Sequence, residues 1–336
     1  MSKVRIAGGS VLALLLAFMP LLVNNYVLQI FLLTITYAIL GLSFALTLKV
    51  GLPRFDVAAW WGVGAYTTAM LMLKTGMSFW LATLIGGAIS VLLGWLVFSV
   101  AIPRGMMVFL LFGMVLVLAF QQLFGTIPFF GGWGGTEVTP QPTIGSFTFA
   151  NKTELYYMGL FFLGVTVVVY RLLYNSKIGR AWNAVGSSVK LASSLGINVV
   201  RYRLANVLIG NFFIAIAGSY LVAYTLVAVP DTFSFANSVY VMMYVVVGGL
   251  THVLVGPLIG AVVITFIPEY LRVAKQFEPI ITAVAIILII ILLPYGFLGF
   301  YDRRVKPWFV RKGWQGTRPD RQSEKTAATL LEIGRD

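Results

Sequence analysis

Few side chains in this 336-residue chain could carry chemistry, and most of these are amides. Gln121 and Gln122 stand near the end of one long apolar segment, whereas Asn206 and Asn211 stand inside another. An amide in such a segment can hydrogen-bond a passing solute, and it can equally bond a neighbouring helix. Interfacial anchoring is the favoured interpretation for the two glutamines. Helix–helix bonding is at least as good an interpretation for the two asparagines.

Three ionisable positions invite other interpretations. Arg54 and Asp56 flank the start of an apolar segment and could form a gate or a plain ion pair, which is the favoured interpretation. His252 lies between glycines in a predicted tight turn, where a neutral turn histidine is favoured over a pH sensor. It is the only histidine, and the chain has no cysteine, so we expect no metal site and no disulfide.

Enzyme motifs are missing from the sequence. There is no GxxxxGK[ST] phosphate loop, no HExxH and no GxSxG, so we expect neither catalysis nor a cofactor. None of the 11 acids stands in the middle of an apolar segment, which disfavours a proton relay. A carrier driven by an ion gradient stays open as the alternative, because sodium sites can be built from carbonyls and hydroxyls.

Composition defines the class of protein. Hydrophobic residues make up 59% of the chain and charged residues only 10%, whereas soluble domains carry about a quarter charged residues. The formal charge of +13 lies in loops and at the C-terminus beside apolar segments, which is typical of cytoplasmic loops rather than of nucleic-acid binding. We predict an all-α polytopic protein in contact with membrane lipid, with a retained first helix.

Apolar runs place the membrane spans. The clear ones are 6–23, 27–48, 57–73, 77–102, 106–124, 155–173 and 204–227, and a shorter one is 280–293. The run 237–267 is broken by Gly248-Gly249, His252 and Gly256-Pro257. Read as two spans, 237–250 and 253–267, it gives about ten crossings and leaves all but four of the 24 Lys and Arg residues inside. We therefore predict ten crossings with both termini cytoplasmic, an external loop 125–154 with a short hairpin, and a basic cytoplasmic tail 301–336.

One polar stretch, residues 176–203, interrupts the apolar chain between the sixth and seventh spans. It contains five Lys and Arg residues and no acid. Ser187 or Ser188 can cap a short helix over 189–195, and Gly196 can end it in the left-handed conformation. Four side chains fall at helical spacing and predict one apolar face: Trp182, Val185, Val189 and Ala192. This helix could dock in the groove of a partner or lie on the lipid surface.

Longer motifs bear a family resemblance. GRAWNAVGSSVKLASSLGINVVRYRLANVLIGNFFIAIAGSYLVAY, from Gly179, resembles a segment of LivM-like permeases of branched-chain amino acid ABC importers. PDTFSFANSVYVMMYVVVGGLTHVLVGPLIGAVVITFIPEYL and AAWWGVGAYTTAML are similar to two further segments of that family, and GGWGGTEV to its external loop. The resemblance covers roughly residues 30–300.

This resemblance implies a function. It implies a bacterial inner-membrane permease domain, residues 1–300, which forms half of a path for a small organic solute such as a branched-chain amino acid. Implied partners are a second permease of similar fold, two ATPase subunits and an external solute-binding protein. Loop 176–203 would be the coupling element that meets the ATPase, through Gly179, Arg180, Ala181, Val189, Ala192, Leu195, Gly196 and Ile197.

The sequence departs from the family pattern at three places. Residues 186–188, GSS, replace acidic residues of the family, so the contact with the ATPase is expected to differ in detail. Residues 51–57, GLPRFDV, replace Gly-Gln-x-Ser-x-Gly-His. Residues 107–112, MVFLLF, replace a hydroxyl-bearing stretch of the fifth span, so the solute or its passage is expected to differ from that of a typical amino acid permease.

Overall fold

The computed structural model describes residues 18–20, 23–138, 140–145, 147–249, 252–271, 284, 288, 291 and 296–300. The predicted tail 301–336 and most of the predicted spans 6–23 and 280–293 lie outside these residues. The main helices are α2 (Asn25–Leu48), α3 (Val57–Thr75), α4 (Phe79–Ala101), α5 (Met106–Thr126), α6 (Lys152–Asn175), α7 (Lys177–Ser187), α8 (Val189–Ser194), α9 (Val199–Thr225), α10 (Phe235–Gly248), α11 (Val255–Leu271) and α13 (Gly296–Phe300).

Five of these helices are long and apolar enough to cross a membrane: α2, α4 with its 3-10 extension, α5, α6 and α9. The chain is therefore a mostly helical, multi-pass membrane protein. α3 has 19 residues and is not among these five helices, and 14 of its residues are buried. It is enclosed by other helices, so it does not need the uniformly apolar surface of a lipid-facing span.

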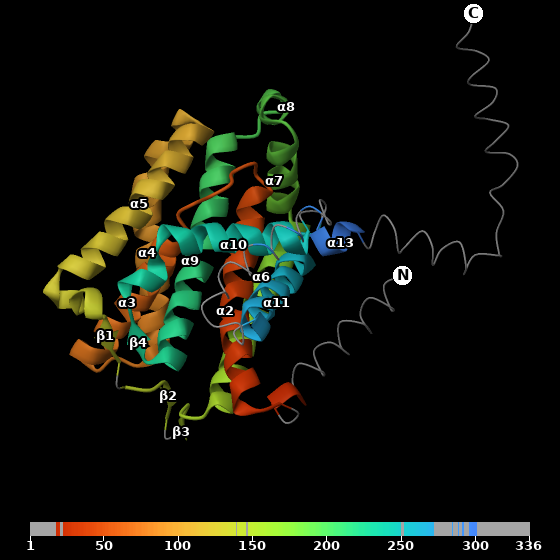
Figure 1. The fold of residues 1–336 in the computed structure, drawn as a ribbon. Coiled ribbons are helices and arrows are strands. Elements are labelled where there is room, and N and C mark those ends of the chain that lie inside the picture. The colour runs from red at the N-terminus through yellow and green to blue at the C-terminus, as the bar shows by residue number, and fades with distance from the viewer. Residues whose placement is uncertain are drawn as a thin grey trace, which may run out of the picture.

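Burial separates a central layer from a peripheral one. In their most apolar stretches α2 is 83% buried and α9 is 78% buried, whereas α5 is only 22% buried. α2 and α9 run through the middle of the molecule, α3 packs along α9, and α5 lies on the outer side of the molecule (Figure 1). α3 and α9 approach each other at Gly64, where a Cβ would meet the backbone of Ala215. Small residues of this kind let helices pack closely in lipid.

The break predicted near His252 is confirmed. α10 and α11 are separate helices that pack against each other, and α10 lies across the bundle rather than along it (Figure 1). With 14 and 17 residues, they extend about 21 and 26 Å, less than the roughly 30 Å hydrocarbon core. At their contact a Cβ on Gly248 or Gly260 would collide with the other helix's backbone.

The two ends of the bundle differ. α7 and α8 lie together at one end, hereafter the α7–α8 end, and the strands lie at the other, hereafter the strand end (Figure 1). The hairpin predicted within 125–154 is confirmed: β2 (Thr143–Ile144) pairs antiparallel with β3 (Phe147–Thr148). A second pairing joins β1 (Thr136–Glu137) to β4 (Val227–Ala228), which directly follows α9. Three 3-10 turns complete this end: Pro128–Phe130, Gly132–Gly134 and Pro230–Phe233.

Candidate functional site: the α7–α8 loop

Serines begin both short helices of the loop. Ser176 caps α7, and its hydroxyl accepts hydrogen bonds from the backbone N–H groups of Ile178 and Gly179. Ser188 caps α8 by accepting from the N–H of Leu191 at 3.3 Å. Gly196 follows α8 with φ +79°, a conformation that glycine adopts without steric cost. The predicted cap and the predicted left-handed end are both confirmed.

α7 is packed into the bundle. Trp182 and Val185 are each 1% exposed, and Ala181 is also buried. The indole Nε1 of Trp182 donates to the carbonyl of Tyr202 in α9 at 3.0 Å. A Cβ on Gly186 would collide with the carbonyl oxygen of Lys49, at the end of α2. α7 is therefore anchored to both α2 and α9.

α8 presents two unlike faces. Ala192 is 1% exposed, whereas Leu191 and Leu195 are 62% and 70% exposed. Val189 was predicted to share one apolar face with Trp182, Val185 and Ala192. That prediction is wrong, because Val189 is 42% exposed, whereas the other three side chains pack on the permease itself. Ser188 explains the difference, because its extended backbone (φ −159°) separates the two helices and breaks the helical spacing on which the prediction relied.

The remaining predicted coupling residues lie in the first turn of α7 and directly after α8. Gly179 is buried where a Cβ would meet the carbonyl of Tyr174 at the end of α6, and Arg180 is exposed. Ile197 is half-buried against the core after α8. Lys177, Lys190 and Arg201 are also exposed, so the surface around the α8 leucines is basic.

Both candidate asparagines serve contacts between segments of the bundle. Asn206 and Asn211 are fully buried in α9. The amide nitrogen of Asn206 donates to the carbonyl of Leu46 in α2 at 3.2 Å. The amide oxygen of Asn211 accepts from Arg54 Nη2 at 2.5 Å. The interpretation as hydrogen bonding between segments therefore describes both residues.

Arg54 and Asp56 form the favoured ion pair, and both side chains are fully buried. Arg54 donates to the carboxylate from Nε at 2.8 Å and from Nη2 at 2.5 Å. The indole nitrogen of Trp60 donates to the same carboxylate at 2.5 Å. A pair with this bidentate geometry is well matched, since both carboxylate oxygens are engaged.

The two candidate glutamines do not join this network. Gln121 is half-buried and Gln122 is exposed, near the strand end of α5. The amide nitrogen of Gln122 donates to the Thr126 hydroxyl at 2.8 Å, within the same helix. The glutamines therefore lie apart from both the loop and the asparagines.

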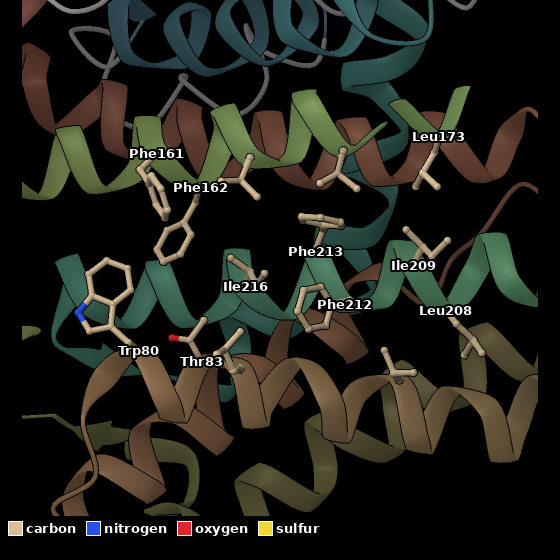
Figure 2. Close-up of a pocket in the computed structure, with 14 residues that line it drawn as sticks. Trp80, Thr83, Phe161, Phe162, Leu173, Leu208, Ile209, Phe212, Phe213 and Ile216 are labelled. Atoms are coloured by element: carbon tan, nitrogen blue, oxygen red, sulfur yellow. The ribbon is translucent and has the colours of Figure 1, made fainter. Parts of the chain in front are cut away.

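An apolar groove of about 730 Å³ lies along α9, between α4 and α6 (Figure 2). Five of its 14 lining residues are aromatic and eight are aliphatic, and Trp80 and Thr83 supply the only polar side-chain atoms among them. Such a surface suits lipid chains. It offers a polar solute no hydrogen-bonding route across the membrane.

Two smaller cavities with polar linings lie at opposite ends of α2. One of about 330 Å³, at the α7–α8 end, is lined by residues that include Lys49, Asn183 and His252. The other, of about 390 Å³, is lined by Tyr26, which donates a hydrogen bond to Glu269, and by Tyr224. None of the candidate path residues lines either cavity or the apolar groove.

Two features of this region were not predicted. Leu191 is the missed residue of α8, and its signal was an apolar side chain directly after Lys190 in a polar loop. The hydrogen bond from Arg54 to Asn211 joins residues 157 positions apart and has no local sequence signal.

Comparisons with known proteins show which family this chain resembles in sequence. A family model described as the branched-chain amino acid transport system / permease component matches residues 26–293. The high-affinity branched-chain amino acid transport system permease proteins LivM of Salmonella typhimurium and Escherichia coli are each 27% identical over 309 residues, covering 83% of this chain and 71% of theirs. A permease protein of Methanocaldococcus jannaschii named LivH is 28% identical over 295 residues, covering 80% of this chain and 90% of its own. No solved structure gives a significant match.

Proposed function

Because this chain belongs to the family of permease components of branched-chain amino acid transport systems, we propose that its α7–α8 loop contacts an ATPase subunit. Membership makes the chain a permease subunit of an ABC importer and not an enzyme, since ATP hydrolysis in this family lies on separate subunits. A second permease and ATPase subunits are the partners that the family implies. Among the residues that the structure describes, the α7–α8 loop combines exposed apolar side chains with a basic surface, which suits contact with an ATPase.

One observation carries the proposal: Leu191 in a six-residue helix, and Leu195 directly after that helix, are both exposed inside a basic loop. So short a helix is unstable alone in water, and it gains order only by packing. Ala192 packs inward on the permease, which leaves the two leucines for a partner. The surrounding bases oppose insertion into hydrocarbon, and a groove on a protein satisfies both the leucines and the charges.

The proposed complex contains this chain, a second permease of similar fold, two ATPase subunits and an external solute-binding protein. It resides in a bacterial inner membrane and carries a small organic solute such as a branched-chain amino acid. Closure of the ATPase pair moves the α7–α8 loop, and the spans shift between two states that differ in their contacts. A carrier driven by an ion gradient is the rival function.

Purification with the native partners separates these two functions. We expect an ATPase subunit to co-purify, and uptake into proteoliposomes to require ATP on the α7–α8 side and the solute-binding protein on the other. Uptake driven by an ion gradient without ATP would overturn the assignment to an importer complex.

Orientation is part of the same proposal. Ten crossings with both termini cytoplasmic place Thr136 outside, and Ser188 and Gln315 inside. The chain has no cysteine, so single cysteines can be introduced at these positions without interference. An impermeant thiol reagent should label Thr136→Cys in intact cells and should label Ser188→Cys and Gln315→Cys only after lysis. Labelling of Gln315→Cys in intact cells would contradict ten crossings.

This chain forms half of the solute path in the proposed complex, and we assign the lining of that half to α5. It is the least buried of the five long apolar helices, and Met107, Leu111 and Val115 project outward along it. Gln121 and Gln122 continue this helix toward the strand end. A path with so apolar an inner half favours a solute with an apolar part. Calorimetry on the partner solute-binding protein tests this, and a strictly hydrophilic ligand such as urea would contradict it.

A further inference from the structure

The connection between α2 and α3, residues 49–56, enters the interior of the bundle as non-helical chain. Asp56 lies against Gly113 of α5. A Cβ added to Gly113 would be 3.2 Å from the side chain of Asp56. Gly113 is the eighth residue of α5, and Asn211, bonded to Arg54, is the thirteenth of α9. At 1.5 Å per residue these contacts lie about 10 and 18 Å inside the ends of those helices. Irregular backbone at such depth requires enclosure by protein.

Three side chains of α9 bind this connection and the end of α2 that leads into it. Arg203 Nε donates to the carbonyl of Val50 at 3.1 Å, and Asn206 bonds the carbonyl of Leu46 at 3.2 Å. Asn211 binds Arg54, which holds Asp56 directly before α3. The α2–α3 connection is thus joined along its length to the first half of α9.

The same part of α9 is joined to the proposed ATPase-binding loop. α8 is followed by Asn198, whose side chain caps α9 by accepting from the N–H of Arg201 at 3.1 Å. Trp182 of α7 bonds the carbonyl of Tyr202, one residue before Arg203. A displacement of α7 and α8 therefore acts first on the end of α9 that holds the connection.

The buried ion pair contributes more to arrangement than to stability. Removing two charges from water costs about as much as their attraction returns, so apolar replacements of buried pairs are often neutral. Arg54 Nη1 and the amide nitrogen of Asn211 also have no hydrogen-bond partner among the described residues. A pair of this kind selects one packing of the connection against α9, because any other packing leaves a charge exposed to apolar groups.

We infer that Arg54 and Asn211 are positioning residues that transmit movement of the α7–α8 loop through α9 to the start of α3. The inference rests on the proposed function, because it assumes that an ATPase acts on this loop. Trp60 and Asp56 carry the displacement into α3, which is packed along α9 and α4. The ionic network is thereby a mechanical link between ATP hydrolysis and the spans.

Asn211→Leu tests the link, because leucine has nearly the shape of asparagine and only the bond to Arg54 Nη2 is removed. In the purified complex with its solute-binding protein, we expect normal assembly and normal basal ATP hydrolysis. Solute stimulation of hydrolysis should fall by at least about fivefold, the lower end of common couplings between sites. Asn211→Asp keeps an oxygen acceptor for Arg54 and should retain the stimulation.

Two further variants complete the test, one as a negative control and one as an independent break of the same link. Ser90→Ala removes the 2.9 Å bond to the backbone carbonyl of Asn211 from α4, outside the connection, and should leave stimulation unchanged. Arg203→Met removes the bond to Val50 at the outer end of the connection, and it should reduce stimulation even if Asn211→Leu does not assemble.

The outcomes separate the two hypotheses. A wild-type complex without solute-stimulated hydrolysis would remove the proposed function itself. Wild-type stimulation that persists in Asn211→Leu, or in Arg203→Met where the former fails to assemble, would overturn the transmission alone. Equal loss in Asn211→Leu and Asn211→Asp would also overturn it, since the acceptor would then be irrelevant.

Discussion

α7 and α8 are neighbours in one loop, yet they bury opposite amounts of their apolar surface. α7 buries Trp182 and Val185 almost completely against α2 and α9, whereas α8 buries Ala192 and exposes two leucines. The difference follows from the extended residue Ser188, which lets the two helices turn different faces to the permease. One helix is therefore built as an anchor and the other as a surface for a partner.

The anchor should be the more sensitive helix to truncation. Trp182→Ala removes a fully buried indole and its hydrogen bond to Tyr202, and large-to-small changes of this size cost about 3–5 kcal/mol. We expect a lower midpoint of thermal unfolding and protease cleavage within 177–195. Trp182→Phe keeps most of the packing and is the matched control. Its unfolding midpoint and its rate of cleavage should lie between those of the wild type and those of Trp182→Ala. Unchanged cleavage in Trp182→Ala would contradict the anchor.

Substitutions on the partner surface of α8 should weaken binding of the ATPase and leave the stability of the permease unchanged. Leu191→Asp combined with Leu195→Asp should leave thermal unfolding of the isolated permease almost unchanged, within about 0.5 kcal/mol, because both leucines are exposed. Retention of the ATPase subunit during purification should fall, since central apolar contacts of an interface are worth about 2 kcal/mol or more.

Ser193→Asp is the control for this pair of substitutions. It adds a charge to an exposed position of α8 and leaves both leucines in place. Full retention of the ATPase in the double leucine variant would remove α8 from the interface.

Ala192→Trp should affect both the packing of α8 on the permease and the contact of α8 with the partner. Ala192 lies in the buried core cluster, so an indole there overpacks the site at a cost of about 1–3 kcal/mol and displaces α8. We expect reduced ATPase retention and faster hydrogen exchange over 189–195. Lys190→Trp puts the same ring on the exposed side and should leave the exchange of α8 unchanged. Wild-type retention and exchange in Ala192→Trp would mean that α8 does not depend on its buried face.

Local chemistry explains how much of this fold was predictable. The Ser188 cap, Gly196, the break near His252 and the β2–β3 hairpin each depend on a few adjacent residues, and all were predicted. The shared apolar face failed at Val189 because one extended residue reset the helical spacing. Arg54 and Asn211 are far apart in sequence, and only the packing of α9 against the 49–56 connection brings them together.

The smallest effect concerns the residue that separates the two helices. Ser188→Ala removes the cap of α8, and loss of such a cap costs about 1 kcal/mol. α8 has six residues and little burial besides Ala192, so no other contact compensates. Amide exchange over 189–195 should accelerate about fivefold, while exchange in α7 stays unchanged. Ser193→Ala, whose hydroxyl bonds only the carbonyl of Lys190 within the helix, is the control and should have little effect. Equal acceleration in α7 and α8 would show that the two helices form one unit, and that the contrast between anchor and partner surface does not hold.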